Sequence, residues 1–196
     1  MNSGRGLFVG LVLGLVAGCG YHFPGGASTL PGGGTRIHVR AFTNTTQEPG
    51  LVNGLQRAFE TEVARRGNFT LVSGGSADVI LIGAIRRLEI RPVGFSQSDE
   101  ALQYETVVTI SARLENARTQ RIVWRLDSLT QNDSYGAVAQ TVVTQSSQFQ
   151  EQSRLSESNL EQLSDVQVSE SQRGSALERV YENLARELYN AMVEDF

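Results

Sequence analysis

The feature that most constrains the fold of this chain is an alternation of side-chain character over residues 103–116. One set of alternate positions is mostly apolar: Tyr104, Thr106, Val108, Ile110, Ala112 and Leu114. The intervening positions are mostly polar: Glu105, Thr109, Ser111, Arg113 and Glu115. Successive side chains of a β-strand point to opposite faces of a sheet, so this pattern predicts a long strand with one buried face and one solvated face.

Four further segments have strand character. Residues 35–42 alternate, residues 69–72 predict a short strand, and residues 121–130 predict a last strand. The core-facing side chains that we predict are Ile37, Val39 and Ala41 in the first of these, and Ile122, Trp124 and Leu126 in the last. Residues 79–82 are apolar on both faces, which predicts the start of a central strand. Its distal half, around Arg86, Arg87, Glu89 and Arg91, is expected to be exposed, and residues 92–101 are expected to form a loop.

Two segments show helical spacing. Leu51, Leu55, Phe59 and Val63 recur every four residues, Pro49 suits the first turn, and Gly67 follows the last turn. Near the end of the chain, residues 175–178 fit a capping box that would start a second helix at Ser175. Its apolar stripe comprises Leu177, Val180, Tyr181, Leu184, Leu188, Ala191 and Met192. The fold class predicted from these elements is α+β, a two-layer sandwich in which a four- to five-stranded, mostly antiparallel sheet packs against two helices.

The amino-terminal segment is predicted to be a lipoprotein signal peptide. Residues 7–16 form an apolar run that is too short to span a bilayer, which needs about 20 residues. The run leads into Val16-Ala17-Gly18-Cys19, a lipobox pattern in which cleavage falls between Gly18 and Cys19 and the cysteine is acylated. The acyl chains would hold the mature chain in a membrane leaflet, and Gly20 favours the outer membrane.

The expected organisation is therefore a signal peptide over residues 1–18, a lipidated flexible tether over residues 19–34, and a single α+β domain over residues 35–196. The tether prediction depends on its glycine content, including Gly32, Gly33 and Gly34. Within the domain, residues 131–172 contain nine Gln and nine Ser among 42 residues. We expect this stretch to be a partly disordered or loosely helical insertion.

Composition excludes several kinds of chemistry. All 17 basic residues are arginine, so a Walker-type phosphate loop and a catalytic lysine are absent from the sequence. With two histidines and one cysteine, a three-histidine or cysteine-based zinc site is excluded. His38 is expected to lie on a strand surface and His22 near lipid headgroups, while Glu48 and Asp78 are expected to be turn or cap groups. We predict no catalytic residues, no cofactor and no metal, and hence no enzyme.

Charge gives the one positive indication of a ligand. The mature chain keeps 16 arginines against 21 acidic residues, a formal net charge of −5, so nucleic acid is not an expected partner. Arg86, Arg87 and Arg91 lie on one predicted strand, and four more arginines flank the following hairpin: Arg113, Arg118, Arg121 and Arg125. This set permits a patch that binds phosphate groups, and we take Arg86, Arg87 and Arg91 as candidate contacts for lipopolysaccharide. The alternative is an ordinary solvated sheet face, balanced by Glu89, Glu115 and Asp127.

Several short motifs together resemble the lipopolysaccharide-assembly lipoprotein family, LptE. They are Cys19-Gly20-Tyr21-His22-Phe23, Leu30-Pro31, the strand from Ile37 to Phe42, Asn44, Glu48-Pro49-Gly50-Leu51, Ala77-Asp78-Val79, Gly83, Tyr104, Val123-Trp124 and the two helices. The cysteine-led start is the most specific of these motifs. The resemblance covers most of residues 19–135 and 174–196.

The resemblance implies a non-enzymatic outer-membrane subunit that lies largely inside the lumen of an LptD-like translocon barrel. It also implies that the protein assists assembly of that barrel and binds lipopolysaccharide during insertion in the outer leaflet. The family's basic contacts lie in loops at one end of the sheet, but residues 92–112 and 131–153 contain no arginine, so none is transferred to this chain.

Two alternatives remain open at this point. One is an outer-membrane lipoprotein that activates a peptidoglycan synthase, which would need a much longer tether than residues 20–34, since these extend at most about 50 Å. The other is a carrier of small apolar ligands, which would need an internal cavity.

Overall fold

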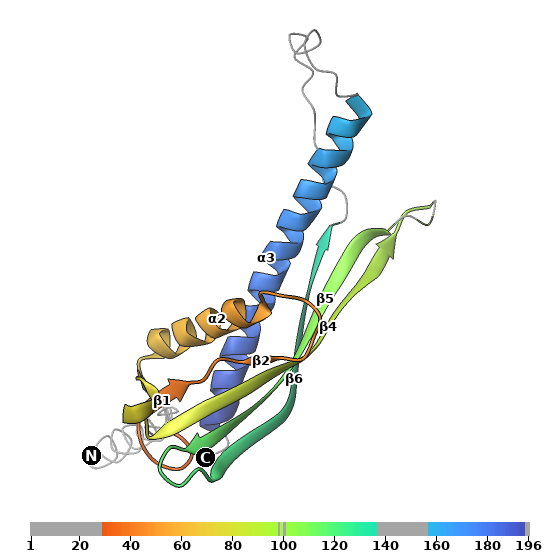
Figure 1. The fold of residues 1–196 in the computed structure, drawn as a ribbon. Helices are drawn as coiled ribbons and strands as arrows, with labels where there is room; N and C mark the ends of the chain where they lie inside the picture. The colour runs from red at the N-terminus through yellow and green to blue at the C-terminus, as the bar shows by residue number, and fades with distance from the viewer. Residues whose placement is uncertain (1–28, 98, 100, 137–156, 195–196) are drawn as a thin grey trace, which may run out of the picture.

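The computed structural model describes residues 29–97, 99, 101–136 and 157–194 (Figure 1). In chain order the elements are β1 (Arg36–Val39), β2 (Thr43–Asn44), α2 (Leu51–Arg66), β3 (Thr70–Leu71), the 3-10 helix η1 (Gly74–Ser76), β4 (Val79–Phe95), β5 (Ala101–Asn116), β6 (Ile122–Gly136) and α3 (Glu157–Glu194). Side chains of α3 are described from Gln167 onward.

The strands form one mixed sheet in the order β3-β1-β4-β5-β6, with β2 pairing beside β1 along β4. The long strands β4, β5 and β6 pair antiparallel, whereas β1 pairs in parallel with both β3 and β4. The parallel pairing arises because helix α2 carries the chain back before the next strand begins. The predicted α+β class is confirmed, with six strands and a parallel edge in place of the four or five mostly antiparallel strands expected.

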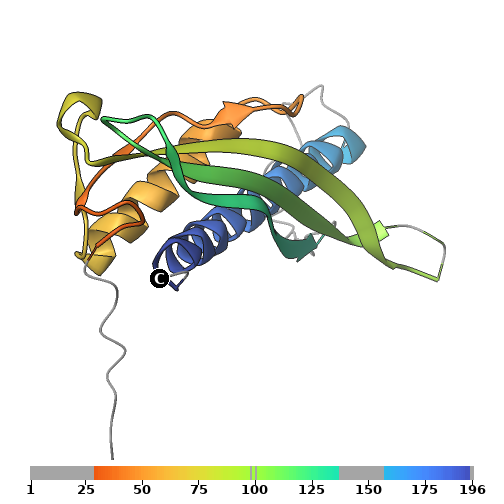
Figure 2. The same cartoon turned by 90° about the horizontal axis from the view of Figure 1, so that it is seen from below.

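Helices α2 and α3 cover one face of the sheet, and the other face is open to solvent (Figure 2). The alternation on β5 is confirmed, because Thr106, Val108, Ile110, Ala112 and Leu114 are all buried under the helices. The stripe on α2 is also confirmed: Leu51, Leu55, Phe59 and Val63 are buried. Gly67 ends this helix with φ of 70°, and its N–H donates to the carbonyl of Val63. Pro49 lies before the helix, which begins after Gly50.

Helix α3 is far longer than predicted. It begins at Glu157, about five turns before Ser175, so the predicted capping box is wrong. The Ser175 hydroxyl instead donates to the carbonyl of Ser171, one turn earlier in the same helix, at 3.1 Å. A serine followed three residues later by glutamate also occurs within helices, and no proline interrupts residues 157–174.

The predicted Gln/Ser-rich insertion is wrong at both ends. Strand β6 continues to Gly136, where it pairs with Gln103, and α3 starts at Glu157. Residues 137–156 of the predicted insertion lie outside the described residues. Polar composition does not prevent pairing here because backbone hydrogen bonds to β5 hold the end of β6, and its side chains need only suit a half-buried surface.

The predicted tether also ends earlier than expected, because residues 30–34 belong to the folded body. Leu30 is 1% exposed and belongs to the core. Its N–H donates to the carbonyl of Gly34, and the Gly33 N–H donates back to the Leu30 carbonyl, each at 2.9 Å. Gly34 has φ of +112°, and a Cβ there would lie 2.5 Å from Cβ of Asp78. Both constraints favour glycine for packing rather than for flexibility.

Three smaller predictions about the strands are wrong. Strand β1 ends at Val39, so Ala41 is exposed and Phe42 takes the core position. A register shift opposite Leu114 and Glu115 makes Val123 an extra residue, which leaves Ile122 52% exposed. The expected loop over residues 92–101 is mostly strand, because β4 pairs with β5 out to Phe95 and Ala101.

Candidate functional site

The solvent-facing side of the long strands, here called the outer sheet face, is the surface on which the sequence placed its candidate ligand contacts. Cross-strand partners share a face, so the register defines this surface. Arg87, Glu89 and Arg91 of β4 lie opposite Thr109, Val107 and Glu105 of β5. These in turn lie opposite Thr130, Asn132 and Ser134 of β6. The face is therefore polar along most of the distal half of the sheet.

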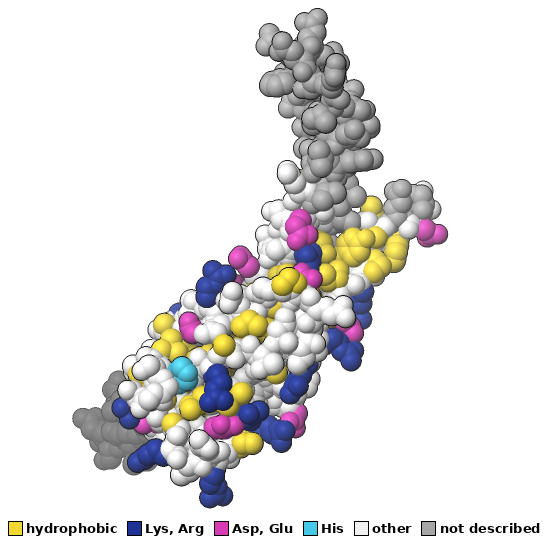
Figure 3. All heavy atoms as spheres, in the orientation of Figure 1, with side chains coloured by type: hydrophobic (Ala, Val, Ile, Leu, Met, Phe, Trp, Pro, Cys, Tyr) yellow, Lys and Arg dark blue, Asp and Glu magenta, His cyan; other side chains and the backbone are white. Residues whose placement is uncertain are grey.

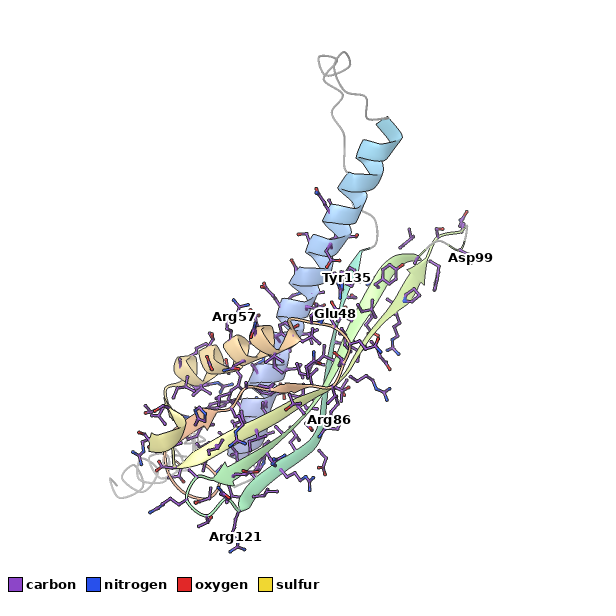
Figure 4. The ribbon with its side chains drawn as sticks, viewed as in Figure 1. Glu48, Arg57, Arg86, Asp99, Arg121 and Tyr135 are labelled. Atoms are coloured by element: carbon purple, nitrogen blue, oxygen red, sulfur yellow. The ribbon has the colours of Figure 1, made fainter. Side chains whose placement is uncertain are left out.

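The structure places Arg86, Arg87 and Arg91 together on exposed β4, as predicted for the strand. A register shift between Ile85 and Arg87 makes Arg86 the extra residue of a bulge. As a result, the neighbouring side chains of Arg86 and Arg87 both reach solvent. Figure 4 shows Arg86 on the strand near the middle of the molecule. Its Nε donates to Oγ of Ser111 at 2.8 Å, across the pair of strands.

Carboxylates partner most arginines of the outer sheet face. Arg87 pairs with Glu89 at 2.9 Å and Arg91 with Glu105 at 2.6 Å. Two further pairs follow the same i, i+2 spacing as Arg87 and Glu89: Arg113 with Glu115 and Arg125 with Asp127, each at 2.8 Å. Glu89, Glu115 and Asp127 are the three acids named in the solvated-face interpretation. The guanidinium groups nevertheless stay exposed, with 67% of the Arg87 and 60% of the Arg91 side chain accessible.

Glu105 is the acidic centre of the distal half of this face. The Arg91 side chain donates to it, and Nδ2 of Asn132 donates to its other oxygen. These hydrogen bonds, chiefly that from Arg91, lower the pKa of Glu105. The carboxylate therefore stays charged at neutral pH and holds Arg91 against the sheet.

A second set of interactions ties the start of the described chain to β4. Asp78 accepts hydrogen bonds from the backbone N–H groups of Thr35 and Arg36 and from the Arg36 guanidinium at 2.7 Å. The Arg36 side-chain bond, followed by the backbone bonds, lowers the pKa of Asp78 to about 2. Glu48 is also paired, with Arg173 of α3 at 2.6 Å, so both acids form ion pairs that the expected turn or cap role did not include.

Between α2 and α3, on the side of the molecule away from the outer sheet face, lies an open groove with a volume of about 790 Å³. Its lining includes Glu48, Arg57, Arg173, Glu178, Tyr181 and Arg186. Arg173 bridges Glu48 and Glu170 at the floor of this groove. Because the lining residues include both acidic and basic side chains, the groove has no single electrostatic preference for a ligand.

The distal tip, the end of the hairpin made by β4 and β5, has a surface that the sequence analysis missed. Four large apolar side chains are exposed there: Ile90 at 40%, Val93 at 47%, Phe95 at 57% and Leu102 at 44%. Figure 3 shows this apolar group at one end of the molecule and arginine side chains gathered toward the other. The apolar residues within 92–102 are visible in the sequence and could have indicated this surface. The prediction that the segment forms a loop caused them to be missed.

The remaining predicted positions give no catalytic geometry. His38 is half-buried, and its Nδ1 lies 3.1 Å from the carbonyl oxygen of Val72. Among the described residues, no group of three metal-binding side chains comes together. Gly18, Cys19 and His22 lie outside the described residues. None of the helices in the described part of the chain is sufficiently long and apolar to cross a bilayer.

Comparison with known proteins identifies the family. Residues 34–192 match the family model described as LptE, lipopolysaccharide-assembly, and the chain therefore belongs to this family. It is thus a lipoprotein of the lipopolysaccharide-assembly type, a class anchored at the outer membrane. No curated protein matches the chain.

Several solved lipoproteins are similar to this chain at low identity. A putative lipoprotein from Caulobacter crescentus CB15 is 13% identical, with a TM-score of 0.49 over 81% of this chain and 88% of that one. A minor lipoprotein from Acinetobacter baumannii is 11% identical, with a TM-score of 0.47 over 82% and 92%. An uncharacterized lipoprotein B from Nitrosomonas europaea is 15% identical, with a TM-score of 0.42 over 90% and 96%.

Proposed function

We propose that this chain is a non-catalytic subunit of the outer-membrane lipopolysaccharide translocon. In this role it occupies the lumen of an LptD-like barrel, assists assembly of that barrel and helps to insert lipopolysaccharide in the outer leaflet. Acyl chains on Cys19, exposed by cleavage after Gly18, anchor it to the inner leaflet. The observation that carries the proposal is the family match over residues 34–192, joined to an outer sheet face whose charges are paired.

The chemistry of the outer sheet face suits the interior of a barrel. Outer-membrane barrels have polar, water-filled interiors, and a plug inside one must present polar side chains without exposing unbalanced charge. Arg87–Glu89, Arg91–Glu105 and Arg113–Glu115 provide this surface, since each pair has one solvated partner and little net charge.

The length of the sheet also supports the lumen location. Strand β4 has 17 residues, which corresponds to a contour of about 55 Å at roughly 3.3 Å per residue. A bilayer with its headgroup layers is about 40–45 Å thick. The domain is therefore long enough to extend through the membrane inside a barrel.

Arg86, Arg87 and Arg91 are the proposed contacts for lipopolysaccharide phosphate groups. Among the described residues, the Arg86 side chain donates to a neutral serine hydroxyl, and Arg87 pairs with a partly exposed glutamate. Exposed ion pairs of this kind contribute at most about 1 kcal/mol, so an incoming phosphate can replace the carboxylate at little cost. A guanidinium group binds phosphate through two parallel hydrogen bonds.

The alternatives, a peptidoglycan synthase activator and an apolar-ligand carrier, are not favoured by membership of the lipopolysaccharide-assembly family. The first is further disfavoured by tether length. Because residues 30–34 pack on the domain, only residues 20–28 remain between Cys19 and the first described residue, Thr29. Nine residues extend at most about 30 Å, far less than a periplasm-crossing tether requires.

The barrel partnership is tested by purifying the tagged full-length protein from its native envelope in mild detergent. We expect a large outer-membrane barrel at near-equal ratio among the co-purifying proteins. The Cys19→Ala variant serves as an anchor control, since the folded domain is unchanged while membrane attachment should be lost. Recovery of a peptidoglycan synthase, or of no stable partner, would overturn the translocon assignment.

The lipopolysaccharide contact is tested separately. The triple variant Arg86→Gln, Arg87→Gln and Arg91→Gln is compared with a control triple, Arg57→Gln, Arg65→Gln and Arg186→Gln, at exposed positions of the helices. Both triples remove the same charge. Weaker binding to lipopolysaccharide aggregates in the first triple alone supports the contact, whereas equal binding by both triples at low salt removes β4 from the site.

A further inference from the structure

We propose that the end of the domain nearest the lipid anchor is a contact surface for anionic phospholipid headgroups of the leaflet that holds the anchor. This surface, here called the anchor-proximal end, consists of Arg118, Arg121 and Ile122 at the connection between β5 and β6. The inference rests on the proposed acylation of Cys19, because acylation determines which end of the domain is held near the membrane.

Packing at the start of the described chain locates this end. A Cβ on Gly32 would lie 2.9 Å from Cγ1 of Val123, so the backbone of residues 30–34 passes directly beside the start of β6. Asp78 binds the backbone of Thr35 and Arg36 and its carbonyl accepts the N–H of Ala117. The entry of the chain and the turn between β5 and β6 therefore lie at one end of the molecule (Figure 1).

The turn that presents the arginines is held in one conformation. Oδ1 of Asn116 accepts the N–H groups of Arg118 at 3.1 Å and Thr119 at 3.0 Å. The Asn116 N–H donates to the carbonyl of Arg121, and the Gln120 N–H donates back to the Asn116 carbonyl. Since the backbone is fixed, Arg118 and Arg121 are displayed outward at low entropic cost to a ligand.

These two arginines differ from the four arginines of the outer sheet face that pair with carboxylates, Arg87, Arg91, Arg113 and Arg125. Within residues 29–97, 99, 101–136 and 167–194, neither Arg118 nor Arg121 lies within ion-pair distance of a carboxylate. Both are exposed, and Figure 4 shows Arg121 projecting from the end of the molecule opposite to Asp99. Two exposed arginines without a carboxylate partner among the described residues thus lie at the end where the anchor enters.

An exposed apolar side chain stands beside the charges. Ile122 is 52% exposed because the register shift at the start of β6 turns it away from the core. Cationic groups next to an exposed isoleucine match the membrane interface, where phosphates lie above the first methylenes of the acyl chains. A polar protein surface could pair with the two arginines but would give the exposed isoleucine no apolar contact. A lipid surface therefore fits this end better.

The anchor geometry brings this end within reach of the headgroups. Nine residues, 20–28, separate Cys19 from Thr29, so the proposed anchor lies at most about 30 Å from the start of the described domain. Electrostatic attraction at physiological ionic strength extends about 8 Å. Held at this range, Arg118 and Arg121 repeatedly enter the field of the anionic surface, which should fix the tilt of the anchored domain.

The test measures vesicle binding by the unlipidated mature chain carrying Cys19→Ala. Vesicles of phosphatidylcholine containing phosphatidylglycerol are compared with vesicles of phosphatidylcholine alone. Each arginine near an anionic surface contributes about five-fold to partitioning, so Arg118→Gln with Arg121→Gln should weaken binding to the anionic vesicles by about 25-fold. The matched control is Arg57→Gln with Arg186→Gln, two exposed helix positions with the same change in charge.

The proposal is supported if only the Arg118→Gln with Arg121→Gln variant loses binding to anionic vesicles, and if high salt removes its difference from the unaltered chain. Ile122→Ser should weaken binding further. Equal loss in both pairs, equal binding to neutral vesicles, or no binding by the unaltered domain would overturn it. If the Arg118→Gln with Arg121→Gln variant loses binding to lipopolysaccharide aggregates but keeps its binding to anionic vesicles, the proposal is also overturned. Membrane attachment of the unaltered full chain is measured in parallel, so failure of the Cys19 anchor is distinguished from failure of the headgroup contact.

Discussion

Two glycines inside helices should respond to alanine in opposite directions. Gly54 lies in α2, where an added Cβ would approach Cε2 of Tyr181 to 2.4 Å and Cδ2 to 2.8 Å. Gly174 lies in α3, and a Cβ there would meet no heavy atom within 4 Å. The comparison isolates the packing of α2 on α3, because helix propensity changes equally at both positions.

The expected magnitudes follow from the two opposing effects. Alanine is more favourable than glycine inside a helix by about 1 kcal/mol, so Gly174→Ala should stabilise the protein by about 0.5–1 kcal/mol. At Gly54 the same gain is set against overpacking, which costs about 1–3 kcal/mol when a buried ring must move. Tyr181 is 7% exposed and packs in the core, so we expect a net loss of about 1 kcal/mol. At roughly 2–4 °C per kcal/mol, the two melting temperatures should differ by about 3–8 °C.

The assay is urea and thermal unfolding of the unlipidated Cys19→Ala chain, followed by circular dichroism. A third variant combines Gly54→Ala with Tyr181→Leu, whose smaller side chain should remove the clash and show a favourable coupling energy. If Gly54→Ala stabilises the protein as much as Gly174→Ala, the close contact between α2 and α3 is refuted.

Three further results are expected. The folded-state pKa of Asp78 is about 2, against an ordinary value of 3.8. The Arg36 interaction therefore stabilises the fold above pH 4, and this stabilisation is lost as the pH falls toward 2. Urea midpoints of the Asp78→Asn variant should be less sensitive to pH in that window than those of the unaltered chain. Ser175→Ala should be neutral or stabilise the protein by about 0.5 kcal/mol, because Ser175 lies inside α3, whereas a loss of about 1 kcal/mol would indicate a helix cap. Phe59→Ala should cost about 3–5 kcal/mol in unfolding free energy, while Phe95→Ala, at a position 57% exposed, should cost little; equal losses would contradict the assigned core.

The parts of the fold that sequence predicted are those where one surface of a local element is buried. The β5 alternation and the α2 stripe each place apolar groups at the period of their own element, so the pattern needs no tertiary information. The starts and ends of β6 and α3 were not predictable in this way. Glutamine and serine are neutral toward both structures, and pairing with β5 or continuation of the helix decides their conformation.

The ion pairs of the candidate site also fall into those that sequence position predicts and those that depend on the fold. The pairs Arg87–Glu89, Arg113–Glu115 and Arg125–Asp127 follow from position alone, because residues two apart on a strand share a face. Arg91–Glu105 and Arg36–Asp78 depend on the register between strands, and Glu48–Arg173 joins residues far apart in the chain. The sequence therefore predicts that opposite charges are paired on the outer sheet face near β4. It does not predict the ion pairs between strands that hold the distal half of that face.

The two ends of the sheet have opposite chemistry, and their separation limits what each can contact. Arg118 and Arg121, which have no carboxylate partner among the described residues, lie where the chain enters from the anchor. Exposed Val93 and Phe95 lie at the distal tip. Strand β4 separates these ends by a contour of about 55 Å, while residues 20–28 extend at most about 30 Å. When the anchored end touches its leaflet, the tip therefore points away from that leaflet. A cluster of exposed apolar side chains marks a contact surface, so the tip needs a partner other than the anchoring leaflet.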